Sequence, residues 1–129
     1  MIILAIRTDK PDAQIVLYDN KTQLQSIEWH AHRELSSTIL IKIRQLLDQN
    51  EKQWSDLQGV VFYKGPGSFT GLRIGASVAN AIAQANGANL VQSNGENWIE
   101  QGMLELLDGA NMQALPEYGA EPHITKQRK

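Results

Sequence analysis

The residues of this chain that could do chemistry gather in one short run, Gly65-Pro66-Gly67-Ser68-Phe69-Thr70-Gly71. The run follows an apolar segment typical of a strand, residues 59–63, and precedes an alanine-rich helical segment, residues 72–86. A glycine-dense turn between a strand and a helix lets the backbone approach a partner closely and directs its amide hydrogens outward. No Gly-Lys-Ser/Thr closes the run and its glycine spacing is GxGxxxG, so it is neither a Walker A loop nor a Rossmann fingerprint.

Ser68 and Thr70 carry hydroxyl groups that could act as nucleophiles in a hydrolase. Such a nucleophile needs a positioned base, and the local sequence is not the Gly-x-Ser-x-Gly elbow. We therefore expect both hydroxyls to bond the loop backbone and cap the following helix. Lys64 and Arg73 flank the run; they could hold a phosphate or a partner's carboxylate, although lone cations are more often solvated.

His30, His32 and Glu34 form a second cluster of potential metal ligands. A catalytic zinc site needs three ligands in fixed geometry, and the two histidines share a face only if their strand extends that far. His123 lies remote in the sequence. Solvated polar residues at a strand-to-helix junction explain the cluster better, so we expect no metal site.

Five strands and three helices are predicted to position these residues. Three short strands with tight turns predict an antiparallel meander, and each later strand follows a helix, which predicts parallel pairing through right-handed crossovers. A capping box at residues 93–96 is expected to start the third helix. The predicted strands are residues 1–8, 13–18, 23–30, 59–63 and 88–91, and the predicted helices are residues 35–50, 72–86 and a third ending near residue 107.

The helix at residues 72–86 has polar residues on only one narrow stripe, formed by Arg73, Ser77, Asn80 and Gln84. The rest of its circumference is apolar or glycine, which predicts burial on more than one side. One side can pack on the sheet. The other side is expected to meet either a partner or the helix at residues 35–50 alone, whose apolar face is Leu35, Ile39, Ile43, Leu46 and Leu47.

The composition is that of an ordinary globular domain, with 129 residues, 42% hydrophobic and 20% charged. A net charge of −2 gives no global reason to expect direct nucleic-acid binding. The absence of cysteine excludes disulfides and thiolate metal sites. No apolar run approaches the ~20 residues of a membrane span, so we expect a cytoplasmic protein.

The literal string from Gly65 to Gly71 resembles the signature of the TsaB (YeaZ) family, which serves tRNA threonylcarbamoyladenosine formation. The resemblance extends from Met1 to about Asn97 and includes the start Ile3-Leu4-Ala5-Ile6 and the approach Trp54-Ser55-Asp56-Leu57. It implies an α/β fold, an actin-like ATPase or ribonuclease-H-like lobe with a mixed five-stranded sheet. The order of the predicted elements points independently to the same fold.

One position departs from the family. TsaB proteins usually have Ile-Asp-Thr-Ser on the first strand, where the aspartate of nucleotide-hydrolysing relatives faces phosphate and metal. This chain has Ile6-Arg7-Thr8-Asp9, so a cation replaces the carboxylate. Asp9 would share a strand face with position 7 and could substitute, although Pro11 indicates that the chain is already turning.

The resemblance implies a non-catalytic scaffold or activating subunit that binds a TsaD-type catalytic subunit through its first two helices. A TsaE-type ATPase and tRNA would join through the complex, where ATP or ADP and a divalent metal are expected; this chain alone is expected to bind no cofactor. When alone, it is expected to form a homodimer. The interface and loop residues expected on this basis are Gly65, Pro66, Gly67, Ser68, Phe69, Thr70, Gly71, Arg73, Ala76, Ser77, Asn80, Leu35 and Ile39.

Family members usually carry a second lobe, which is expected to be missing or reduced here. We expect a single lobe over residues 1–107 and an extended or disordered basic tail over residues 108–129. Two other functions stay open: an ATPase or hydrolase that uses the Gly65–Gly71 loop, and a module that binds tRNA directly, which a pI near 5.9 disfavours.

Overall fold

The computed structural model describes residues 1–115. Five strands and three α-helices follow the predicted order, and two short 3-10 turns, His32–Glu34 and Trp54–Asp56, precede α1 and β4. The elements are β1 (Ile2–Arg7), β2 (Asp12–Asp19), β3 (Thr22–His30), α1 (Leu35–Gln49), β4 (Leu57–Tyr63), α2 (Phe69–Asn86), β5 (Asn89–Ser93) and α3 (Trp98–Leu107).

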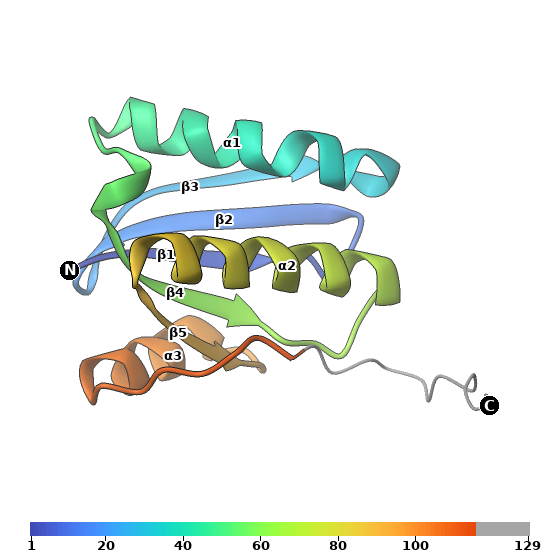
Figure 1. Ribbon diagram of the computed structural model, residues 1–129. Helices are drawn as coiled ribbons and strands as arrows, with labels where there is room; N and C mark the ends of the chain where they lie inside the picture. The colour runs from blue at the N-terminus through green and yellow to red at the C-terminus, as the bar shows by residue number, and fades with distance from the viewer. Residues whose placement is uncertain (116–129) are drawn as a thin grey trace.

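The five strands form one mixed sheet in the order β3-β2-β1-β4-β5. The first three strands pair antiparallel, whereas β4 pairs parallel with β1 and β5 pairs parallel with β4. Both parallel pairings follow a helical connection (Figure 1). The predicted fold, an antiparallel meander extended by two crossovers, is confirmed.

Two helices cover one face of the sheet and one covers the other. Figure 1 shows α1 and α2 across the same face, while α3 packs on the opposite side. The central strand β1 serves both layers, since Leu4 and Ile6 belong to the α1–α2 core and Ile3 and Ala5 to the α3 core. This double burial explains why the start of the sequence is continuously apolar rather than alternating.

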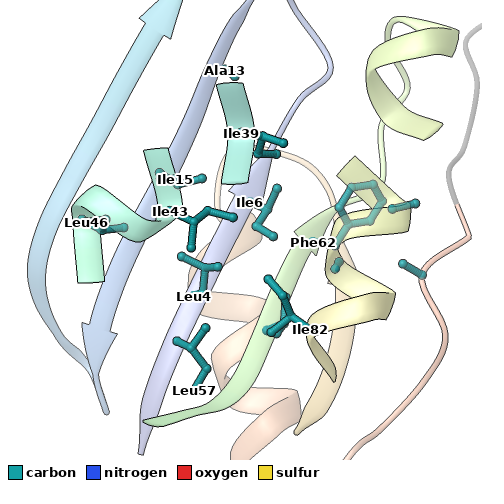
Figure 2. Packing of buried hydrophobic residues seen from close by; sticks show 14 of the residues in the cluster. Leu4, Ile6, Ala13, Ile15, Ile39, Ile43, Leu46, Leu57, Phe62 and Ile82 are labelled. Carbon is teal, nitrogen blue, oxygen red and sulfur yellow. The ribbon is translucent and has the colours of Figure 1, made fainter. Parts of the chain in front are cut away.

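The larger core lies under α1 and α2. Figure 2 shows Ile39 and Ile43 of α1 directed toward Leu4 and Ile6 of β1. All five residues of the predicted apolar face of α1 are buried, as the 3.6-residue period requires. On α2 the buried residues are Leu72, Gly75, Ala76, Ala79 and Ile82.

The predicted start of the third helix is wrong. Ser93 is the last residue of β5 rather than a helix cap, and its hydroxyl donates a hydrogen bond to the carbonyl oxygen of Trp98. The helix begins only at Trp98, with no side-chain cap at Asn97. The spacing of a capping box is present, but the pairing of Ser93 with Tyr63 of β4 keeps the segment extended.

After α3 the chain returns along the edge of the sheet. The amide of Met112 donates to the carbonyl oxygen of Leu90 at 2.7 Å, and the Asn111 side chain accepts from the Leu90 amide. Ala114 is buried in the larger core, where its amide donates to Asn80 Oδ1 at 2.8 Å. Residues 116–129, which hold most of the predicted basic tail and His123, lie outside the described residues.

None of the helices within residues 1–115 combines the length and the apolar character needed to cross a bilayer.

Candidate functional site

The glycine run forms the turn between β4 and α2, beyond the carboxyl ends of the parallel strands β1 and β4 (Figure 1). Ser68 is the N-cap of α2: its Oγ accepts a hydrogen bond from the Gly71 amide at 3.2 Å. The predicted capping role of Ser68 is confirmed. Because this cap stands before Phe69, the helix begins three residues earlier than the apolar pattern indicated.

The glycines are required because the loop lies directly on the end of β1. A Cβ at Gly67 would meet the Asp9 side chain and lie 2.8 Å from the Asp9 carbonyl oxygen, and one at Gly71 would collide with the Thr8 carbonyl oxygen. Gly65 differs, since its φ of 107° is in the region that favours glycine. The close approach at Gly67 and Gly71 is therefore to the chain's own backbone.

Thr8 and Asp9 hold the loop in this position. The Ser68 amide donates to the Asp9 carbonyl oxygen at 2.9 Å, and the hydroxyl of Thr8 donates to the Gly71 carbonyl oxygen at 2.8 Å. Thr8 is fully buried. Thr8 is a functional residue that the sequence patterns above do not identify; a polar residue that ends a buried apolar strand is the signal that could have revealed it.

Arg7 and Asp9 form an ion pair at the same strand end. Arg7 Nε donates to Asp9 Oδ1 at 2.8 Å and Nη2 donates to Oδ2 at 3.2 Å, while the guanidinium lies 4.0 Å from the ring centre of Tyr63. The hydrogen bond with Asp9 holds the pKa of Arg7 above its usual range, against the opposing effect of partial burial. Position 9 does share a face with position 7, but both oxygens of its carboxylate are bound by the chain's own cation.

Ser68 and Thr70 are exposed and line a cavity of about 300 Å³ with His32, Lys10 and Arg33. Among the hydrogen bonds of residues 1–115, none joins the His32 ring to either hydroxyl. The arrangement that a serine or threonine nucleophile needs, a base within hydrogen-bonding distance, is not assembled in the described part of the chain.

The histidine cluster lies at the surface. His30 Nδ1 contacts Asp12 Oδ1 at 2.7 Å, and the His30 ring stacks on His32 at 5.8 Å between ring centres. Glu34 is exposed next to this pair in sequence. Across residues 1–115 no three His, Asp or Glu side chains are grouped as a metal site requires.

The polar stripe of α2 faces solvent, as its spacing predicts. Arg73, Ser77 and Gln84 are exposed, whereas Asn80 is half-buried and bonded to Ala114. Three of the expected interface residues, Leu35, Ile39 and Ala76, are buried in the core.

A groove separates α1 from α2 on the side away from the sheet. Its cavity of about 360 Å³ has an apolar floor and wall with polar residues at the rim. Leu40 is 51% exposed there although it is a large apolar side chain. We call this the α1–α2 groove; its lining residues are Ser36, Ile39, Leu40, Thr70, Arg73, Ile74, Ser77 and Val78.

Sequence reasoning missed Leu40, Ile74 and Val78 as surface residues of this groove. The signal for Leu40 was present, because it is a large apolar residue at the margin of the apolar face of α1. A large apolar residue beside the core face of a helix indicates a second apolar contact.

Known proteins share this architecture. A family model described as TsaD: tRNA N6-adenosine threonylcarbamoyltransferase matches residues 28–107, more than half of the chain. The solved structure "YeaZ from Pseudomonas aeruginosa" superposes with a TM-score of 0.68 at 26% identity, covering 78% of this chain and 50% of that one. A Thermus thermophilus RuvC structure, with a TM-score of 0.52 and 9% identity over 91% of this chain and 86% of that one, shares the fold alone.

Curated relatives carry two names. Proteins named tRNA threonylcarbamoyladenosine biosynthesis protein TsaB, from Buchnera aphidicola (subsp. Acyrthosiphon pisum) and Escherichia coli, are each 32% identical over 82 and 83 residues. These alignments cover 64% of this chain but only 37% and 36% of the relatives, so the chain spans well under half their length. A tRNA N6-adenosine threonylcarbamoyltransferase of Caldivirga maquilingensis is 43% identical over 60 residues, 46% of this chain and 18% of that protein.

The fold defines the class: a ribonuclease-H-like lobe of the actin-like ATPase type. Within that class, the chain matches the TsaD family model over residues 28–107. Inside this family it belongs to the TsaB (YeaZ) group. The resemblance carried by Gly65–Gly71 is thus confirmed.

Proposed function

We propose that this chain is a non-catalytic scaffold or activating subunit for the formation of threonylcarbamoyladenosine on tRNA. In this proposal it binds a TsaD-type catalytic subunit through the α1–α2 groove. A TsaE-type ATPase and tRNA join through the complex, in the cytoplasm, and nucleotide and divalent metal belong to the complex rather than to this chain alone.

The observation that carries the proposal is the α1–α2 groove. A groove floored by Ile39 and walled by Leu40, Ile74 and Val78 leaves apolar surface in water unless another surface covers it. Two helices with a gap between them can accept a pair of helices from a partner, and the crossing geometry of a four-helix packing suits such a face.

A scaffold role, as opposed to catalysis, is supported by the end of β1. Arg7 stands where a phosphate-facing carboxylate is expected, and it binds both oxygens of the nearby Asp9. A carboxylate held in this way is neutralised within the protein and must first release Arg7 before it could bind a cation. The catalytic candidates in the loop, Ser68 and Thr70, serve as a helix cap and as cavity lining.

Reconstitution tests the proposal. The purified chain is combined with the TsaD-type and TsaE-type proteins of the same organism, the threonylcarbamoyladenylate donor system and tRNA, and the modified nucleoside is measured by mass spectrometry. We expect product only when this chain is present, and no ATP hydrolysis by the chain alone. Equal product without it would remove the scaffold role, and hydrolysis by the isolated chain would favour the ATPase alternative.

A further inference from the structure

One end of the α1–α2 groove is strongly basic. Arg73 lines the groove itself, while Lys10 and Arg33 line the adjoining cavity, and the two cavities share Thr70 and Ile74. We call Lys10, Arg33 and Arg73 the basic end of the groove. All three side chains are exposed, and none of them takes part in an ion pair within residues 1–115.

Of the acidic residues nearby, Asp9 is paired with Arg7, and the exposed Asp12 contacts His30, which carries a charge only when it is protonated. Glu34 is the exposed carboxylate that remains beside Arg33 in sequence. The far end of α1 is different, since Arg44 has its own partner in Asp48 at 3.8 Å. The chain as a whole carries a net charge of −2, so the basic end stands against the overall charge of the protein.

We infer that the surface which docks in the α1–α2 groove is a protein surface with an apolar centre and carboxylates facing Lys10, Arg33 and Arg73. This inference rests on the proposed function and specifies the partner: one helical face of the TsaD-type subunit carries Asp or Glu at the end that meets the start of α2. The orientation of that face on the groove follows, because the reversed orientation leaves the three cations unmatched.

Nucleic acid fits this surface less well. A phosphate backbone requires cations distributed along the track it follows, whereas Arg73 is the one cation that lines the groove itself, beside the apolar residues Leu40, Ile74 and Val78. An apolar centre with charges at its margin is the arrangement found in protein interfaces, where the centre supplies affinity and the margin supplies association rate and orientation.

Charge reversal tests the inference. Binding of the purified TsaD-type subunit is measured at 50 mM and 500 mM NaCl for the wild type, Arg33→Glu, Arg73→Glu and Lys21→Glu. Lys21 lies in the turn between β2 and β3, is exposed and is outside both cavities, so Lys21→Glu makes the same charge change elsewhere. Thermal unfolding of each variant verifies that the fold is retained.

We expect Arg33→Glu and Arg73→Glu each to raise the Kd about tenfold or more at 50 mM NaCl, chiefly through slower association. The difference should shrink severalfold at 500 mM NaCl, where charges beyond a few ångströms are screened. Lys21→Glu should bind within about twofold of the wild type. Cross-linking of the complex with a carbodiimide should join Lys10 to an Asp or Glu of the partner.

Three outcomes would overturn the inference. Wild-type binding that is tight, insensitive to salt and unchanged by Arg33→Glu and Arg73→Glu would remove the acidic partner face while leaving the proposed function intact. Failure of the wild type to bind the TsaD-type subunit would contradict both the proposed function and this inference. The third outcome is that the chain alone binds a tRNA transcript and that both arginine variants lose this binding but keep TsaD binding. It would show that the basic end binds tRNA phosphates and not partner carboxylates.

Discussion

At the scale of single residues, the ion pair between Arg7 and Asp9 occupies the end of β1, next to the glycine loop. Asp9 is only 7% exposed, and both oxygens of its carboxylate accept hydrogen bonds from the Arg7 guanidinium. Arg7 in turn lies against the Tyr63 ring, which holds its side chain in place. The ion pair therefore has a structural role at the end of β1.

Arg7→Asp should destabilise the protein without creating an ATPase. The substitution removes the partner of a buried carboxylate and adds a second carboxylate beside it, which should cost about 2–4 kcal/mol in the free energy of unfolding. Urea unfolding measures the loss, and phosphate release measures hydrolysis. The double variant Arg7→Met with Asp9→Asn, which removes both charges, should lose less than Arg7→Asp; turnover of ATP by Arg7→Asp would contradict the structural role.

The close approach of the glycine loop to Asp9 determines the expected effect of Gly67→Val on stability. A glycine at such a turn is required either by a positive φ or by close approach to another part of the backbone. The φ of Gly67 is not positive, and the obstacle is the Asp9 backbone. Val at position 67 should therefore destabilise the fold itself by about 1–3 kcal/mol or more.

Thermal unfolding of Gly67→Val, with Ser77→Ala on the exposed side of α2 as the control, measures this effect. A melting temperature equal to that of the wild type would show that the loop can move off β1, which the hydrogen bond from the Ser68 amide to the Asp9 carbonyl opposes.

At the scale of elements, α2 has one buried side, and Arg73 and Ser77 of its polar stripe line the α1–α2 groove together with Ile74 and Val78. Its apolar breadth predicted burial on more than one side, but in the described structure the buried residues share one face of the helix, and Ala81 and Ala85 are exposed. Ala76 is 6% exposed and Ala79 is fully buried, and both belong to the larger core. Ala76, which we expected at the interface, is therefore a core residue.

Ala76→Glu and Ala79→Glu should both unfold the protein or reduce its stability by several kcal/mol, because each puts an unpaired carboxylate into the larger core. Ser77→Glu, which lies between them in sequence but is exposed at the rim of the groove, should keep the fold. Circular dichroism during thermal unfolding separates the variants. A folded Ala79→Glu protein with a wild-type melting temperature would show that α2 is not anchored as described.

The strands, the faces of α1 and the C-terminal glycine of α2 could be predicted because local patterns determine them. Leu35, Ile39 and Ile43 follow the helical period, and Gly87 has the left-handed conformation of a helix end. The start of α3 could not be predicted, because Ser93 pairs with Tyr63 in the sheet and does not cap the helix, although the local sequence has the spacing of a capping box. The ion pair of Arg7 and the groove position of Leu40 depend on residues brought together only by the sheet.

At the scale of the whole molecule, the two faces of the sheet have different surfaces. The α1–α2 side carries the groove with Leu40, Ile74 and Val78, bounded by the basic end. The opposite side carries α3, where Leu104 is 57% exposed. Helices α1 and α3 thus each present a large exposed leucine. Leu40 lies between two helices beside Arg73, whereas Leu104 lines a separate cavity with Glu96 and Glu100.

This difference supplies a matched pair of variants, Leu40→Gln and Leu104→Gln. Each replaces an exposed leucine by a neutral polar residue of similar size, so neither should change the fold and neither alters the charge of the surface. If the α1–α2 groove is the docking surface, Leu40→Gln leaves an amide in a closed apolar contact, at a cost of roughly 1–3 kcal/mol.

The most direct test of the account is the affinity of these two variants for the TsaD-type subunit, measured by isothermal titration calorimetry. We predict that Leu40→Gln raises the Kd by about tenfold, which corresponds to about 1.4 kcal/mol, and that Leu104→Gln binds as the wild type does. Wild-type affinity in Leu40→Gln, or a loss confined to Leu104→Gln, would contradict the assignment of the partner to the α1–α2 groove.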